Sequence, residues 1–186
     1  MKFILAIFAS LILSFGTRAH AAATETATFA AGCFWGTEEF FRKIPGVLET
    51  KVGYIGGAKK ATYNEVSSGG TGHAEALELK FDPSKVTYEK LLTFFWKMHD
   101  PTTLNRQGND QGSQYRSAVF THSAAQAKLA NDLKAKIDAS KAWKKPLVTE
   151  IKDAGIFYTA EDYHQKYLIK NPGGYDNHYL RELDFK

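Results

Sequence analysis

Apolar and polar residues alternate in several short stretches of the chain, and this two-residue period is typical of strands with one buried face. The first stretch alternates Thr and Glu with Ala and Phe, and another places three apolar residues opposite Glu78 and Lys80. The alternation predicts five strands, at residues 25–31, 47–55, 77–81, 116–121 and 147–152.

Other stretches carry apolar residues at the three- and four-residue spacing of an amphipathic helix. The first of them ends before Pro45-Gly46. A later one follows a capping box formed by Ser123 and Gln126, and Thr159 with Asp162 repeats that start signal. The spacing predicts four helices, over residues 33–43, 88–98, 123–137 and 163–169.

The order of these elements is β-α-β-β-α-β-α-β-α, which indicates an α+β fold: a two-layer sandwich of helices against a mixed sheet. Two long stretches, 56–75 and 100–116, follow neither period and are rich in glycine and polar residues. Long loops in a compact domain are usually functional, and each of these ends in ionisable or phenolic residues where a strand begins. We therefore expect both loops to direct polar side chains into one cleft.

The N-terminus has the features of a cleavable export signal. Lys2 supplies a positive charge, an apolar run covers residues 3–15, and Ala19-His20-Ala21 gives the small-x-small cleavage pattern. The apolar run is too short to span a membrane. We expect residues 1–21 to be a signal peptide and the protein to be exported, periplasmic or secreted. Residues 30–33 also resemble a lipoprotein processing box, but a polar stretch separates them from the apolar run.

The residues after this signal, 22–186, suit a single domain with a sizeable core. Removing Lys2 and Arg18 lowers the formal net charge from +4 to +2. A charge this small requires neither nucleic acid nor an anionic membrane as a partner. We expect one catalytic domain that acts as a monomer.

Cys33 is the only cysteine of the chain. A lone thiol in an oxidising compartment cannot form an internal disulfide, so it pairs with another chain, is inertly buried, or is reactive. Small residues before it, aromatic residues after it and a predicted helix start at the thiol favour reactivity. A helix N-terminus stabilises a thiolate and lowers the thiol pKa. Glu38 and Glu39 would oppose this effect unless they face solvent or cap the helix, as we expect.

The run Gly32-Cys33-Phe34-Trp35-Gly36 resembles the active-site motif of the A-type peptide-methionine sulfoxide reductases. The resemblance continues in the same order through Gly53-Tyr54, Tyr63-Asn64-Glu65-Val66, Gly69 to Glu75, Gly108-Asn109-Asp110, Gln114-Tyr115-Arg116-Ser117 and His164-Gln165-Lys166-Tyr167-Leu168. It implies thiol-dependent reduction of the S epimer of methionine sulfoxide, free and in oxidised proteins, which are thereby repaired. It implies no metal or organic cofactor. It also implies the family's sandwich with a split β-α-β, ferredoxin-like core and extended loops.

The resemblance assigns the chemistry to two residues. Cys33 is the nucleophile that attacks the sulfoxide sulfur, and this attack moves negative charge onto the sulfoxide oxygen. That oxygen must be protonated or strongly hydrogen-bonded as the charge develops. Glu75 is the acid, and burial must raise its pKa if it is to stay protonated near neutral pH.

The resemblance also assigns the surroundings of the sulfoxide. Tyr63 and Tyr115 donate hydrogen bonds to the sulfoxide oxygen, and Asp110 orients a water molecule or a neighbouring donor. Phe34 and Trp35 line an apolar pocket for the methyl group of the substrate. These five residues complete the predicted site.

The sequence departs from a common pattern of that family, in which resolving cysteines often lie in the C-terminal tail. The tail here, residues 171–186, contains none, and Ser67 occupies a position where some members place a cysteine. Attack on a sulfoxide would leave Cys33 as a sulfenic acid. We therefore expect an external thiol or a thioredoxin-like protein to reduce it.

Three alternatives stay open on the residues alone. The spacing from Cys33 to His164 resembles that of papain-like hydrolases, with Asn177 orienting the imidazole, although Phe34 separates the cysteine from its tryptophan. A metal site is a second alternative, but the histidines after residue 21 contain no pair at helical ligand spacing. A non-catalytic sulfoxide-binding module would keep the aromatic residues and would not need Cys33.

Overall fold

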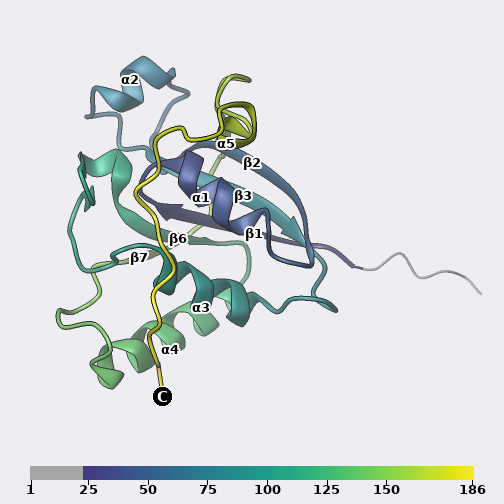
Figure 1. Cartoon of the computed structure of the whole chain (residues 1–186), viewed down its shortest axis with the longest axis vertical. Coiled ribbons are helices and arrows are strands. Elements are labelled where there is room, and N and C mark those ends of the chain that lie inside the picture. The colour runs from purple at the N-terminus through teal and green to yellow at the C-terminus, as the bar shows by residue number, and fades with distance from the viewer. Residues whose placement is uncertain (1–22) are drawn as a thin grey trace, which may run out of the picture.

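The computed structural model describes residues 23–186, and the predicted signal peptide lies outside the described residues. A six-stranded sheet with the order β7-β6-β1-β3-β2-β8 forms its centre (Figure 1). Its strands are β1 (Glu25–Ala31), β2 (Val47–Ile55), β3 (Ala74–Phe81), β6 (Ser117–Thr121), β7 (Glu150–Asp153) and β8 (Tyr158–Thr159). β6 and β7 pair in parallel and the other neighbours pair antiparallel, so the sheet is mixed, as predicted.

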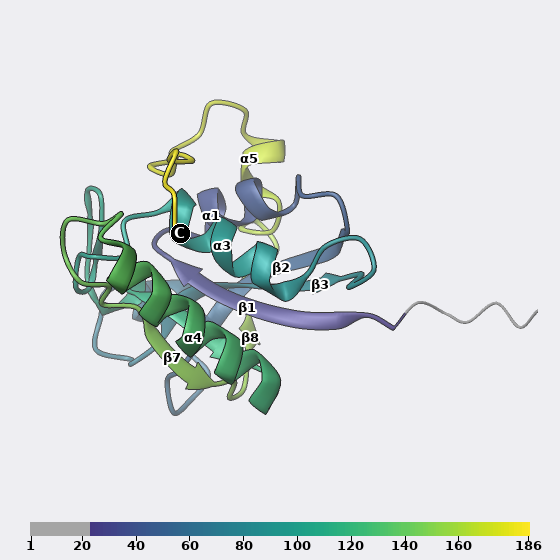
Figure 2. The same ribbon diagram turned by 90° about the horizontal axis from the view of Figure 1, so that it is seen from below.

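The long helices pack on one face of this sheet. They are α1 (Phe34–Phe41), α3 (Tyr88–Met98) and α4 (Ala124–Ser140). Figure 2 shows α1 and α3 lying along the same side of β1. Alternate strand residues such as Phe29, Leu79 and Val119 meet the helices in the main core. The predicted two-layer α+β arrangement is confirmed. No helix within residues 23–186 is both long enough and apolar enough to cross a membrane.

The core on the opposite face of the sheet is smaller, and among the described residues no helix contributes to it. Ala30, Ala76 and Phe120 form a second buried cluster there, against which Ala154 and Phe157 pack. The alternation along the strands thus separates two cores. Glu75 lies two residues before Leu77 on β3, so its side chain projects toward the helical face, where α1 begins.

The helix predicted over residues 163–169 is wrong in extent. α5 covers Tyr167–Lys170, and residues 162–166 form turns. Lys166 has a φ of 55°, in the left-handed region, which interrupts helical geometry. The Gln165 side chain accepts from the Val52 N–H at 3.0 Å and donates to its carbonyl at 2.9 Å, so this residue extends the sheet edge.

Both long loops contain short elements that the periodicity did not predict. The first holds α2 (Tyr63–Ser67), and the second holds β4 (Arg106–Gln107), β5 (Asp110–Gln111) and a 3₁₀ turn, η1 (Ser113–Tyr115). α2 begins with a capping box of Thr62 and Glu65. That Thr-x-x-Glu pattern is a helix start signal readable in the sequence. These elements place tyrosines and an aspartate at the end of the sheet where α1 starts.

Candidate active site

Cys33 lies between β1 and α1 as the N-cap residue of the helix, so the predicted helix start at the thiol is confirmed. Gly32 precedes it with a φ of 96°. A side chain on Gly32 would place its Cβ 2.5 Å from Cγ of Gln107. Glycine is therefore required both by the turn and by the close approach of the β4 segment. Cys33 lines a cavity together with loop residues and is not part of the main core.

Glu75 is held beside the thiol from the neighbouring strand. The first helical N–H of α1, that of Phe34, donates to Glu75 Oε2 at 3.1 Å. The residue is 1% exposed. Burial raises its pKa to about 8, Asp110 acts in the same direction, and the Phe34 hydrogen bond opposes them. At neutral pH the carboxyl group is therefore mostly protonated and can donate a proton.

The predicted lowering of the Cys33 pKa is wrong for the ligand-free protein. Burial raises this pKa well above its ordinary value, and the charge of Glu75 adds to the increase. The backbone N–H groups of Trp35 and Gly36 act in the predicted direction, but they are outweighed. The resting pair consists of a neutral thiol beside a carboxyl group, and burial disfavours ionisation of both groups.

Tyr63 and Tyr115 enter the site from the two loops. Tyr63 opens α2, and its backbone N–H donates to Glu161 Oε1 at 2.9 Å, which fixes the start of that helix. Tyr115 ends η1. Burial raises the pKa of both phenols, and the nearby charge of Glu75 raises them further. Both hydroxyl groups thus remain hydrogen-bond donors at physiological pH.

Asp110 is held by two residues of the C-terminal tail. Its carboxylate accepts from Tyr175 Oη at 3.0 Å and from Asn177 Nδ2 at 2.9 Å. His178 fastens the same tail, because its Nδ1 lies 2.8 Å from Asp176 Oδ1 and its Nε2 lies 2.7 Å from the carbonyl oxygen of Ala31. The tail therefore closes one side of the site.

These residues enclose one cavity of about 190 Å³. All seven predicted site residues line it, together with one that sequence reasoning missed, Tyr175: Cys33, Phe34, Trp35, Tyr63, Glu75, Asp110, Tyr115 and Tyr175. Tyr175 lies in a tail without helical or strand periodicity. Its position after two glycines is the only local signal, and it marks a turn rather than a site.

The family of this chain is identified by comparison with known proteins. The family described as "Peptide methionine sulfoxide reductase" matches residues 25–184. The chain belongs to this family. A peptide methionine sulfoxide reductase MsrA of Methanothermobacter thermautotrophicus is 54% identical over 149 residues, which cover 80% of this chain and 88% of that protein.

Solved structures support the same assignment. Mxr1 from Saccharomyces cerevisiae in reduced form matches with a TM-score of 0.82 and 41% identity, over 88% of this chain and 95% of that one. Mxr1 has also been solved in complex with Trx2, and that structure matches with a TM-score of 0.60 and 29% identity, over 91% of this chain and 99% of that one.

Glu38 differs from the prediction that it faces solvent or caps the helix. In this reductase its side chain is 2% exposed and pairs with Lys166 Nζ at 2.6 Å. It also accepts from the Lys166 backbone N–H at 2.7 Å and from Thr50 Oγ1 at 2.8 Å. The carboxylate thus joins α1 to the segment before α5. Glu39 pairs with Arg42 and Lys43, which directly follow its helix, and stays partly exposed.

The hydrolase arrangement is not assembled in this reductase. His164 Nδ1 accepts from Trp35 Nε1, and the Asn177 amide bonds to Asp110 and to the carbonyl oxygen of Gln107 rather than to an imidazole. Within residues 23–186, no group of three or more metal-ligating side chains is gathered. Each of the five histidines among these described residues instead makes a hydrogen bond inside the protein: His73, His99, His122, His164 and His178.

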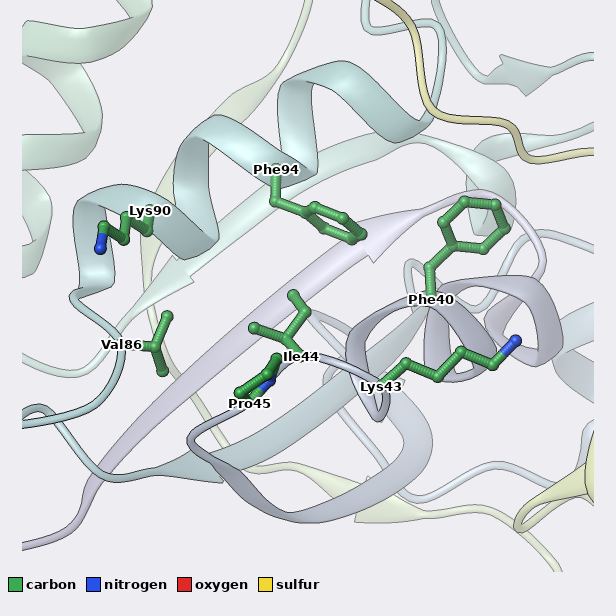
Figure 3. Close-up of a pocket in the computed structure, with 7 residues that line it drawn as sticks. All are labelled: Phe40, Lys43, Ile44, Pro45, Val86, Lys90 and Phe94. Atoms are coloured by element: carbon green, nitrogen blue, oxygen red, sulfur yellow. The ribbon is translucent and has the colours of Figure 1, made fainter.

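A larger apolar groove lies between α1 and α3, away from the thiol (Figure 3). Its volume is about 490 Å³, and it shares no lining residue with the Cys33 cavity. Apolar side chains, among them Phe40, Ile44 and Phe94, line it together with two lysines, Lys43 and Lys90. It holds no nucleophile and no acid, so size alone does not mark the reactive site.

Proposed function

We propose that the protein reduces methionine S-sulfoxide, free and in proteins, to methionine, and so repairs oxidised proteins. One observation carries the proposal. A thiol, a buried carboxyl group with a pKa of about 8 and two phenols converge on a single small cavity with aromatic walls. Reduction of a methyl sulfoxide requires a nucleophile for the sulfur, a proton donor for the oxygen and an apolar wall for the methyl group.

We assign the first step to Cys33 and Glu75. The Cys33 sulfur attacks the sulfoxide while Glu75 donates its proton to the oxygen and receives the thiol proton. The oxygen passes from methionine to Cys33, whose sulfur is oxidised by two electrons as the methionine sulfur is reduced by two. The products are methionine and a Cys33 sulfenic acid, and Glu75 ends protonated, ready for another turnover.

The phenols and the aromatic walls position the sulfoxide. Tyr63 and Tyr115 donate to the oxygen as negative charge develops on it, and both stay protonated at neutral pH. Phe34 and Trp35 contact the substrate methyl group. Asp110 orients the hydroxyl group of Tyr175, from which it accepts a hydrogen bond at 3.0 Å.

Regeneration of Cys33 requires a thiol from outside the chain, because the sequence contains one cysteine. Two external thiols supply two hydrogens, release water and become a disulfide, which returns Cys33 to the thiol. A small-molecule thiol or a thioredoxin-like protein fits this role. The similarity to Mxr1, which has been solved in complex with Trx2, supports the second donor.

Several further expectations belong to the same proposal. We infer that residues 1–21 direct export to the periplasm or outside the cell, and that residues 22–186 act as a monomeric catalytic domain. We also infer the split β-α-β core of ferredoxin-like folds. The strand order β6-β1-β3-β2, with α1 and α3 as the connecting helices, supports that assignment.

The test is turnover of each sulfoxide epimer by the purified chain with dithiothreitol. We expect methionine from the S epimer alone and no turnover by the Cys33→Ser variant. Retained binding of the S epimer by that variant would show that the cavity is intact. Equal reduction of both epimers, or activity that survives the substitution, would contradict the mechanism. Binding without turnover by the wild-type protein would instead favour a binding module.

A further inference from the structure

His164 lies behind the wall of the active-site cavity and does not line it. Its Nδ1 accepts from the indole Nε1–H of Trp35 at 2.9 Å. Since an indole nitrogen only donates, Nδ1 carries no proton and the imidazole proton lies on Nε2. The hydrogen bond therefore exists only with the neutral imidazole in one tautomer.

The other ring nitrogen of His164, Nε2, makes no hydrogen bond to the described residues. His164 is 1% exposed, so this nitrogen is buried. An unsatisfied buried donor is costly, so a purely structural site would favour an apolar ring here. Within residues 23–186, the one hydrogen bond that the His164 side chain makes is to the indole of Trp35, in the wall of the cavity.

Three cavity-lining residues pack against this imidazole. The ring centroids of Tyr63, Phe34 and Trp35 lie 4.4, 5.0 and 5.7 Å from that of His164. Tyr167 stacks on the indole of Trp35, with ring centroids 3.7 Å apart and an interplanar angle of 10°. Stacking on Tyr167 does not fix the position of the indole within its own plane. The directional hydrogen bond to His164 supplies that restraint.

The segment that carries His164 is itself anchored on both sides. Glu161 accepts from Tyr54 Oη at 2.8 Å, and Gln165 bonds to the backbone of Val52. Lys166 is tied to Glu38. Because these bonds hold the backbone, the imidazole has a fixed position from which to orient Trp35.

We propose that neutral His164 is a positioning residue for the Trp35 wall, and that its protonation releases the indole and weakens sulfoxide binding. The inference rests on the proposed function of the cavity. An imidazolium offers no lone pair at Nδ1, so the Trp35 donor would lose its partner and the wall its fixed orientation.

The groups around the imidazole determine the pH at which His164 is protonated. Burial lowers the His164 pKa from 6.5, and the charge of Glu161 opposes that decrease. Tyr63 from α2 and Tyr163 from the same segment also pack on the ring, and both phenols have raised pKa values and stay neutral. From α1 the ring meets Phe34 and Trp35, which do not titrate. Release is therefore expected on the acid side of the ordinary histidine pKa.

The direct test is the indole N–H signal of Trp35 in ¹H–¹⁵N NMR spectra of the ¹⁵N-labelled protein. The sequence contains three tryptophans, and Trp35→Phe identifies the signal that is lost. We expect that signal to shift as the pH falls below 6.5 and to stay constant in His164→Asn, whose amide oxygen can accept at the Nδ1 position without titrating. Trp96, which donates to Thr149 at 3.1 Å, is the internal control. A Trp35 signal that does not move, or that moves equally in the variant, would overturn the inference.

Kinetics supply a second readout. Loss of a buried hydrogen bond is worth about one kcal/mol, so we expect His164→Phe to raise KM roughly 5- to 10-fold with a smaller effect on kcat. His164→Asn should restore KM and remove its increase at low pH. Equal loss of kcat in both variants would oppose a positioning role. If the wild-type protein reduces no sulfoxide, the proposed function fails, and the NMR titration still decides the link between His164 and Trp35.

Discussion

Glu75→Gln is expected to remove a loss of stability that the wild-type protein undergoes as the pH rises. The folded protein holds the Glu75 proton up to a pKa of about 8, whereas the unfolded chain releases it near 4.5. Between these values the folded state binds more protons than the unfolded state. The stabilisation is therefore complete below 4.5 and is lost as the pH rises through about 8.

The size of this loss follows from the two pKa values. One pKa unit corresponds to about 1.4 kcal/mol, so a shift from 4.5 to about 8 costs on the order of 5 kcal/mol above pH 8. At pH 7 the cost is about 3 kcal/mol. Glutamine carries no charge at either pH, and its amide oxygen can still accept the Phe34 N–H. The substitution therefore removes the titration and keeps the local contact.

Urea unfolding measures the effect. We expect Glu75→Gln to gain several kcal/mol relative to wild type between about pH 5 and about pH 8, and kcat/KM to fall by about 10²- to 10⁴-fold because the acid is gone. Glu182→Gln, at an exposed position of the tail, is the matched control and should follow wild type. Parallel pH profiles for wild type and Glu75→Gln would refute the reasoning, as would an undiminished kcat/KM.

Three other experiments test separate parts of the account. Replacing Tyr63 or Tyr115 by Phe should lower kcat about 10²-fold in steady-state assays, since each removes one donor to the developing charge, and unchanged rates in both variants would rule out that role. Glu38→Ala should lower the unfolding free energy by about 2–3 kcal/mol, because its buried partners lose their acceptor; a loss within error in denaturant titrations would count against this bond network. The proposed signal peptide predicts that the mature protein begins at Ala22, which N-terminal sequencing measures, and a mature protein that begins at Met1 would contradict it.

Local patterns predicted the sheet and its helical face well. Two-residue alternation located the five longer strands because successive residues face opposite sides of the sheet, although β6 is buried on both sides. The capping box at Ser123 marked the start of α4. β8, with two residues, is too short to carry a period. The helix predicted over residues 163–169 begins too early, because Gln165 and Lys166 form hydrogen bonds with residues of β2 and α1 instead.

Tertiary contacts explain what the sequence did not reveal about the site. The partner of Glu38 is 128 residues away, so its burial leaves no local signal. The helix start at Cys33 was predicted, but the effect on the thiol pKa depends on burial and on Glu75, which lies on another strand. The family motifs brought seven cavity residues together, whereas Tyr175 joins them only through its contact with Asp110.

The central claim is that one thiol takes the oxygen of the sulfoxide. Mixing the reduced protein with excess S-sulfoxide, without any other thiol, and measuring both methionine and intact mass tests it most directly. The account predicts one methionine per protein, because the chain has one cysteine, and a mass gain of one oxygen that a sulfenic-acid reagent traps on Cys33. Continued turnover without added thiol, or methionine released from a protein whose Cys33 stays unmodified, would contradict it.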